Sequence, residues 1–232
     1  MGAAGPATMH MDMQLQSESP AVGVMTAEQS PEARMAPYLD IVANKSSFPV
    51  FASQIVDTMA LLENEDVSLR KLGEVVTANY GLTLKVLQVA NAFGNNPNGI
   101  PIFDVHLAIF RLGVERVRAM ASGMVYFEHF RGQSDAVKDL VLLSLVSANQ
   151  SELAAEALKS TNIEEAYLSG MLRNLGEVLI ASYFPDDYGR IRTKEAAPNV
   201  TPAVASRRVL GFTYDEFGLA AARRWKMPCL LY

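Results

Sequence analysis

The stretch Y-L-S-G-M-L-R-N-L-G-E-V-L-I, residues Tyr167 to Ile180, is an apolar helical segment interrupted by the polar pair Arg173-Asn174. At about 100° per residue, a helix over 167–183 gathers its large apolar side chains on one broad face. We expect that face, which holds Leu168, Met171, Leu172, Leu175 and Leu179, to lie in the core. The opposite side mixes small and polar residues, namely Ala166, Gly170, Arg173, Asn174, Glu177 and Ala181. The pattern predicts a central helix that its neighbours cover around most of its circumference.

The polar side of this helix has two interpretations. Arg173, Asn174 and Glu177 could form a solvated face, in which Arg173 and Glu177, four residues apart, make a weak pair worth a few tenths of a kcal/mol. Alternatively, the same three side chains could line a polar pocket that recognises a ligand or a partner protein. The residues alone leave both interpretations open.

Outward from this segment, the chain has the spacing of helices. From Met35 onward apolar residues recur every three or four positions, with almost no alternating runs, so we predict an all-α fold. Half of the 232 residues are hydrophobic, enough for a sizeable core. Residues 1–33 lack periodicity and are rich in small and polar residues, which predicts a flexible leader. The remainder, 34–232, divides into helical halves at 34–133 and 134–232, and a long helix over 135–159 opens the second half.

Helix boundaries follow from capping residues and turn formers. We expect Gly81 to break the chain, a loop over 91–101, and Gly113 to separate two helices. Helix starts are expected at Pro49, Ser68, Asp104 and Thr201-Pro202, and at two capping boxes, Asn162 with Glu165 and Thr213 with Glu216.

Composition excludes several classes of partner. The net charge of −5 gives no general attraction to nucleic acid or to an anionic membrane, so we expect neither as a partner. No apolar run approaches the roughly 18 residues of a membrane span, and the first residues do not resemble a secretory signal. The single cysteine, Cys229, fits a reducing compartment. We therefore expect a cytoplasmic location.

Motifs for common chemistries are missing from the sequence. There is no phosphate-binding glycine loop and no G-x-S-x-G element. Of the three histidines, His10 lies in the leader, while His106 and His129 have no companion at metal-ligand spacing, and we expect these two to be ordinary imidazoles.

The central segment nevertheless resembles a known family. Residues 166–180 are similar to the A-F-L-A-G-L-L-H-D-I-G-K-L-V-L type of helix in the HD superfamily of metal-dependent phosphohydrolases, and more closely to its HDOD branch. Similar elements recur almost throughout the chain from about residue 36. They lie at 48–51 (F-P-V-F), 67–76 (V-S-L-R-K-L-G-E-V-V), 82–92 (L-T-L-K-V-L-Q-V-A-N-A), 108–118 (A-I-F-R-L-G-V-E-R-V-R) and 209–218 (V-L-G-F-T-Y-D-E-F-G), followed by Trp225 and Pro228. The resemblance implies a helical bundle whose second half is HD-like.

The resemblance also implies that the catalytic site of the superfamily is degenerate here. That site uses His and Asp ligands around one or two metal ions. Arg173-Asn174 occupies the His-Asp position, and Gln150 stands where an active enzyme has its first His. Arginine has no free lone pair, and an asparagine amide is a weak ligand. We therefore expect no catalysis, no metal and no cofactor.

A role in bacterial signal transduction follows from the same resemblance. The implied mechanism is recognition of other signalling proteins or domains through a helical surface or a vestigial pocket near Gln150, Arg173, Asn174 and Glu177. The alternatives are a metal-dependent phosphohydrolase with ligands that do not align, and a nucleotide or cyclic-dinucleotide sensor with Arg173 on a phosphate. The family pattern usually continues beyond the position of Tyr232, so we also expect a shortened C-terminal bundle that could favour self-association.

Overall fold

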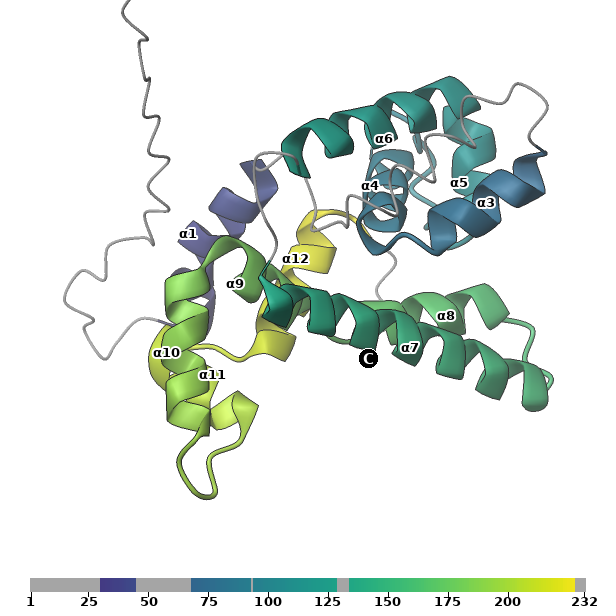
Figure 1. Cartoon of the computed structure of the whole chain (residues 1–232). Helices are drawn as coiled ribbons and strands as arrows, with labels where there is room; N and C mark the ends of the chain where they lie inside the picture. Colours follow the sequence, from purple (N-terminus) through teal and green to yellow (C-terminus); the bar gives the residue numbers. More distant parts are fainter. Residues whose placement is uncertain (1–29, 45–67, 93, 129–133, 228–232) are drawn as a thin grey trace, which may run out of the picture.

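The computed structural model describes residues 30–44, 68–92, 94–128 and 134–227. Every regular element in these ranges is a helix, which confirms the predicted all-α fold (Figure 1). None of these helices has the length and apolar character needed to cross a bilayer. The predictions for residues 1–29, for a helix opened by Pro49, for His129 and Cys229, and for the C-terminal edge at 228–232 fall outside the described ranges.

The first group of helices comprises α3 (Leu69–Thr77), α4 (Tyr80–Asn91), α5 (Val105–Leu112) and α6 (Val114–Glu128). Two predicted caps are confirmed: the Ser68 hydroxyl accepts from the Lys71 amide at 3.2 Å, and Asp104 accepts from the His106 amide at 2.7 Å. Gly113 separates α5 from α6 in a conformation with φ of 83°, which glycine adopts without steric cost. A loop expected over 91–101 is also present, but it lies after Asn91, where α4 ends, and extends to the start of α5 at Val105.

One predicted break in this group is wrong. Gly81 is buried inside α4, because that helix begins one residue earlier at Tyr80. The Asn79 side chain accepts from the Leu82 amide at 3.0 Å and so supplies the cap. A glycine in the first helical turn then serves as an ordinary helical residue.

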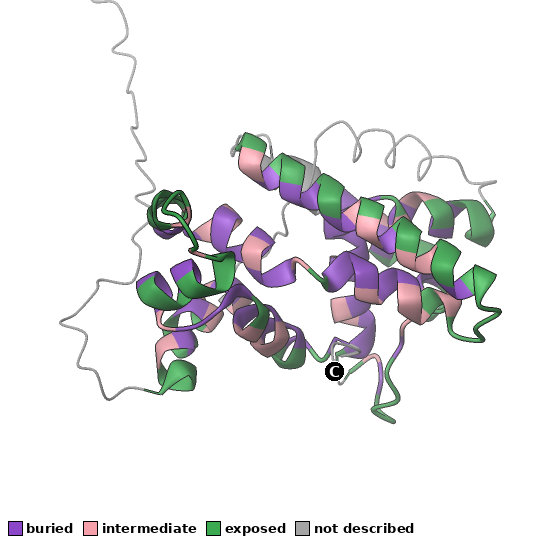
Figure 2. Cartoon of the chain, turned by 90° about the horizontal axis from the view of Figure 1, so that it is seen from below, coloured by how far each residue is buried: buried purple, intermediate pink, exposed green. Residues whose placement is uncertain are grey.

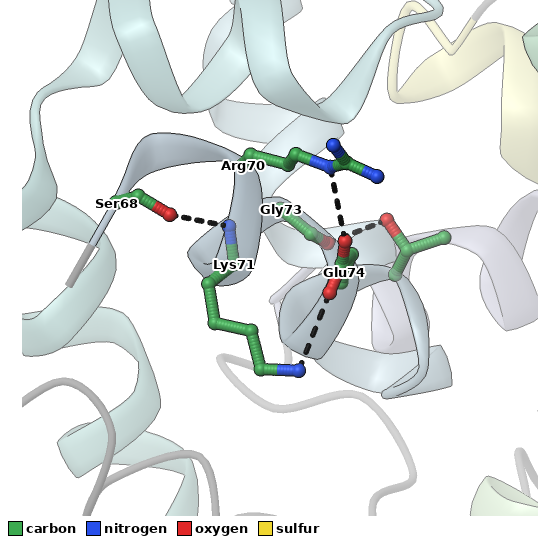
Figure 3. A network of polar contacts seen from close by, with 6 residues as sticks. Ser68, Arg70, Lys71, Gly73 and Glu74 are labelled. Carbon is green, nitrogen blue, oxygen red and sulfur yellow. Dashed lines mark hydrogen bonds and ion pairs between the residues drawn. The ribbon is translucent and has the colours of Figure 1, made fainter.

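The exposed start of α3 carries a small polar network, shown in Figure 3. Glu74 accepts from both Arg70 Nε and Lys71 Nζ at 3.3 Å, one helical turn away, beside the Ser68 cap. These hydrogen bonds lower the pKa of Glu74, chiefly the one from Lys71. Because all three charged side chains are substantially exposed, the network is a solvated helix surface that adds little to stability.

The second group begins with α7 (Asp135–Ala157), the predicted long helix, and α8 (Ile163–Leu172), which lies beside it in Figure 1. It continues through α9 (Leu175–Tyr183), α10 (Pro185–Glu195), α11 (Pro202–Leu210) and α12 (Tyr214–Arg224). Thr201 caps α11, and Thr213 with Glu216 forms the predicted capping box of α12. The capping box predicted at Asn162 is wrong, since Asn162 makes no side-chain cap bond and instead accepts from the neighbouring Thr161 hydroxyl at 3.2 Å.

Helix α1 (Pro31–Asn44) packs on the second group, although it precedes the first group in sequence. Tyr38 donates to Asp187 of α10 at 3.0 Å, and its ring lies 4.6 Å from Phe184 and 5.4 Å from Phe212. Residues 31–33 of the expected leader are helical as well. The division at 133 and 134 remains a prediction, and the structure adds that α1 belongs spatially with the later helices.

A single hydrophobic core runs through both groups, from Met35 to Met227. Figure 2 shows buried residues on the inward sides of the helices and exposed residues on the outward sides. At the junction, Tyr167 of α8 donates to the carbonyl of Thr77 in α3 at 3.1 Å. This hydrogen bond joins the start of the central segment 167–180 to the first group of helices.

Candidate functional site

The polar pair Arg173-Asn174 forms a break between two helices. The prediction of one continuous helix over 167–183 is wrong at this point, because α8 ends at Leu172 and α9 begins at Leu175. Arg173 keeps helical angles, whereas Asn174 leaves them, with φ of −99° and ψ of 13°. The polar pair thus lies at a bend in the backbone rather than along one helix face.

Two glycines beside the bend allow close helix contacts. A Cβ on Gly170 would come within 2.5 Å of the Ser147 carbonyl oxygen of α7. A Cβ on Gly176 would come within 1.8 Å of the Tyr214 carbonyl oxygen of α12. The expectation that the small residues of this segment let another helix approach closely is confirmed at Gly170, and Ala181 is buried too.

A pocket of about 110 Å³ opens at the bend. The first turns of three helices, α9, α11 and α12, meet around it, so their backbone amides give its wall a partial positive charge. Its lining residues are Arg173, Asn174, Gly176, Glu177, Pro202, Ala203, Thr213, Tyr214 and Asp215. The structure therefore brings together three of the four predicted site residues.

Arg173 and Asn174 differ in their surroundings. Arg173 is exposed, while Asn174 is half-buried and its Nδ2 lies 3.5 Å from the Ser144 hydroxyl of α7. The fourth predicted residue, Gln150, is exposed on α7 and does not line the pocket. Ser144, six residues earlier, supplies the α7 hydroxyl that lies near Asn174.

Glu177 turns away from Arg173 toward α10. Its Oε1 accepts a hydrogen bond from Tyr188 at 3.2 Å, and the predicted Arg173–Glu177 pair is absent from the ion pairs of the described residues. Burial raises the pKa of Glu177, and the hydrogen bond from Tyr188 opposes that rise. Burial also raises the pKa of Tyr188 to about 12, with the Glu177 charge as a second cause.

Further titratable groups surround Glu177. Burial raises the pKa of Tyr214 well above its ordinary value, and the charges of Glu177 and Glu195 add to the effect. The Tyr214 hydroxyl and Glu195 Oε1 are both buried without a hydrogen-bond partner among the described residues, although Glu195 Oε2 pairs with Arg192. Burial on this side of the pocket therefore disfavours the ionised forms of Glu177, Tyr188 and Tyr214.

The residues at the bend do not fit the metal ions of the HD superfamily. No group of three or more His, Cys, Asp or Glu side chains is placed to hold a metal ion within the described ranges. Arg173 is a permanent cation, and Asn174 offers one neutral oxygen. His106 lies in the first group, where its Nδ1 is 3.3 Å from Asp104 at the start of α5. We therefore derive no metal-dependent step at this site.

Sequence reasoning missed three residues of the site, namely Ser144, Tyr188 and Tyr214. Tyr214 follows the capping residue Thr213 directly, so the capping box could have indicated that the start of α12 is polar. Ser144 and Tyr188 carry no local signal, since they reach the site through helix packing over 30 and 11 residues of sequence.

The sequence of this chain matches the model of a known protein family. The HDOD domain model matches residues 48–232. An uncharacterized protein of Treponema pallidum (strain Nichols) is 24% identical over 186 residues, which cover 78% of this chain and 35% of that protein. The chain thus spans about a third of this relative.

Two solved structures share the fold. The MmoQ response regulator of Methylococcus capsulatus has a TM-score of 0.66 at 22% identity, over 78% of this chain and 71% of the other. A virulence factor of Campylobacter jejuni has a TM-score of 0.64 at 16% identity, over 88% and 72% of the two chains. At these identities the likeness concerns the fold.

Proposed function

Since the chain belongs to the HDOD domain family, we propose that it is a non-catalytic regulatory module of bacterial signal transduction that acts in the cytoplasm by binding other proteins. A regulatory role fits the description of the structurally similar MmoQ as a response regulator. The partner of this chain would be another signalling protein or domain.

The observation that carries the proposal is the chemistry of the bend between α8 and α9. By the sequence resemblance, Arg173 and Asn174 occupy the position of the His-Asp pair of the superfamily, and the Ser144 hydroxyl of α7 lies 3.5 Å from Asn174 Nδ2. Because these side chains supply a cation, an amide and a hydroxyl, they suit hydrogen bonding to a partner better than coordination of a cation. The exposed guanidinium of Arg173 is available for a carboxylate of a partner protein.

The size of the pocket also supports recognition of a protein over a nucleotide. Pockets for small molecules and cofactors usually enclose about 300–1,000 Å³, whereas this one holds about 110 Å³. A single partner side chain fits that volume. A cyclic dinucleotide would have to lie largely outside it.

A second candidate is an anion sensor, favoured by the three helix N-termini that meet at the pocket beside Arg173. A phosphate group would suit these amides, but the carboxylates of Glu177 and Asp215 line the same wall and oppose it. Burial raises the pKa of Glu177, which reduces this opposition as the pH falls. The sensor would bind its ligand without hydrolysing it.

The proposal is tested by capture of partners from the source cell. Wild type is compared with the double variant Arg173→Ala/Asn174→Ala, and partners identified by mass spectrometry should be retained by wild type and lost by the variant. A matched control is Arg116→Ala/Asn95→Ala, which removes an Arg–Asn pair joined at 2.9 Å in the first group of helices. Equal loss with both variants, or equal retention with both, would contradict recognition at the bend.

Equilibrium dialysis against cyclic dinucleotides separates the sensor from the protein adaptor. We expect no saturable binding by wild type. Saturable binding that Arg173→Ala abolishes would instead establish the sensor.

A further inference from the structure

Helix α1 lies outside the part of the chain that matches the HDOD model, residues 48–232, and yet it packs on that part. Its inward side chains, Met35, Tyr38 and Val42, are buried in the shared core. On its exposed side Asp40 accepts from Arg224 of α12 at 2.5 Å. Helix α1 is therefore an added element that one face holds to the family domain.

The sequence of α1 makes it a weak helix by itself. Pro37 lies inside the helix and has no amide hydrogen, so the carbonyl of Ala33, four residues earlier, receives no intrahelical bond from it. Isolated helices of about this length, 14 residues, are marginal in water. The helical state of α1 thus depends on its packing, and undocking and unfolding of α1 form one step. Such a segment opens at a lower free energy than the domain that it covers.

Tyr38 of α1 contacts the same turn of α10 that carries Tyr188. The Tyr38 ring lies 4.6 Å from Phe184, and its hydroxyl donates to Asp187 at 3.0 Å. The Tyr188 amide donates to the Phe184 carbonyl at 2.9 Å and so closes this turn. The Tyr188 hydroxyl donates to Glu177 in the wall of the pocket. One backbone turn, 184–188, therefore has α1 on one side and the pocket wall on the other.

Asp187 makes this turn sensitive to the presence of α1. Its side chain is buried, and its two oxygens accept hydrogen bonds from Tyr38 and from Arg190, the latter at 2.9 Å. A buried carboxylate that loses one of its donors is costly, so the turn has to move toward water when α1 leaves. Because Tyr188 is the next residue in the chain, it moves with Asp187.

We propose that α1 is a releasable strap: docked, it holds Tyr188 against Glu177 in the pocket at the α8–α9 bend, and released, it lets this wall of the pocket come apart. The two states of the turn 184–188 are the switch, and the docking of α1 selects between them. The inference rests on the proposed function for the role of the pocket as the recognition site that the strap regulates.

Amide hydrogen exchange of the full chain tests whether α1 opens by itself. In wild type, the amides of α1 should exchange about a hundredfold or more faster than the buried amides of α9. Pro37→Ala should slow exchange in α1 by about tenfold or more, because it adds the missing donor and removes the ring. Val76→Ala, at a buried position of α3, is the matched control. It weakens the core and should leave exchange in α1 unchanged.

Carbon-13 NMR titration of Glu177 tests the connection to the pocket. With α1 docked, Tyr188→Phe should raise the pKa of Glu177, because it removes the hydrogen bond that opposes the effect of burial. In a Tyr38→Ala background, where α1 is released, the same substitution should have no effect. The charges that act on Glu177 are those of Glu195, Arg192 and Asp215, so α1 reaches it through the turn alone.

Two further backgrounds complete this test. Val76→Ala should keep the full effect of Tyr188→Phe on Glu177. Tyr38→Phe, which removes only the hydroxyl and is the milder change, should reduce that effect and serves in place of Tyr38→Ala if circular dichroism shows that variant to be unfolded. Neither measurement needs a partner, so a failed capture at the bend would contradict the proposed function and leave these outcomes intact.

Two results would overturn the strap. The first is exchange in α1 as slow as in α9. The second is an effect of Tyr188→Phe on the Glu177 titration that is the same with and without the Tyr38 side chain, whether that effect is a shift or none.

Discussion

Tyr188 of α10 donates a 3.2 Å hydrogen bond to Glu177 of α9, and this contact fixes the acidic wall of the pocket at the α8–α9 bend. The contact counteracts the effect of burial on Glu177, because a hydrogen bond to the charged carboxylate favours ionisation. The hydrogen bond from Tyr188 therefore influences the charge of the Glu177 carboxyl group, which lies beside Arg173 in the lining of the pocket.

Tyr188→Phe should raise the pKa of Glu177 further. The variant removes the hydrogen bond that opposes desolvation and should cost about 1 kcal/mol of unfolding free energy. Carbon-13 NMR titration of the Glu177 carboxyl measures the pKa directly. An unchanged titration curve would mean that Tyr188 does not interact with the carboxylate in solution.

Glu177→Gln should make stability less dependent on pH. Burial raises the pKa of Glu177 above its ordinary value of 4.5, so the folded chain binds the proton more tightly than the unfolded chain. The contribution of Glu177 to stability is therefore highest below pH 4.5 and falls as the pH rises from 4.5 through the folded-state pKa.

Urea unfolding between pH 4 and pH 8 checks this sign. As the pH rises, the free energy of unfolding of Glu177→Gln should increase relative to that of wild type. For Glu74→Gln, which removes an exposed carboxyl with a lowered pKa, the free energy of unfolding should decrease relative to that of wild type. A constant difference between wild type and Glu177→Gln across this range would contradict the assigned shift.

Gly176→Ala should destabilise the chain by at least about 1–3 kcal/mol. The new Cβ would lie 1.8 Å from the Tyr214 carbonyl oxygen, a backbone atom that cannot rotate away, so α9 and α12 must separate. Gly189→Ala in α10 is the control, because nothing lies within 4 Å of its Cβ. That substitution should stabilise by about 0.5–1 kcal/mol through helix propensity. Thermal unfolding of both variants measures the contrast, and equal effects would show that α9 and α12 are not in this contact.

Tyr38→Phe should cost about 1.5–3 kcal/mol, the range for a hydrogen bond to a charged group. The variant keeps the aromatic packing of α1 on Phe184 and Phe212 but leaves the buried Asp187 with one bond fewer. Arg190, which holds the other carboxylate oxygen at 2.9 Å, remains in place. Chemical unfolding provides the value, and a loss below about 0.5 kcal/mol would contradict the docking of α1 on α10.

The features predicted correctly from sequence were those decided by neighbouring residues. The caps at Ser68, Thr201 and Thr213 lie within three residues of the amides that they bind, so spacing alone was enough. The same reasoning gave a wrong cap at Asn162, whose side chain accepts a hydrogen bond from the adjacent Thr161 instead of capping α8. It also gave one continuous helix over 167–183, where the structure has two.

The errors at the site have a common physical origin in packing between distant segments. The bend at Asn174 accompanies the contact of Gly176 with α12, about 40 residues later, and no local pattern reports such a contact. The resemblance points to Gln150, but in the structure it is Ser144 of α7 that lies near the bend. Whether Arg173, Asn174 and Glu177 bind a partner stays a prediction.

The central claim is that the bend between α8 and α9 holds no catalytic metal ion. Elemental analysis of the purified full chain, after incubation with Mn, Fe, Ni or Zn and removal of free ions, tests it most directly. We predict a metal content well below one ion per chain that Arg173→Ala/Asn174→Ala leaves unchanged. One tightly held ion per chain, lost in that double variant, would contradict the account.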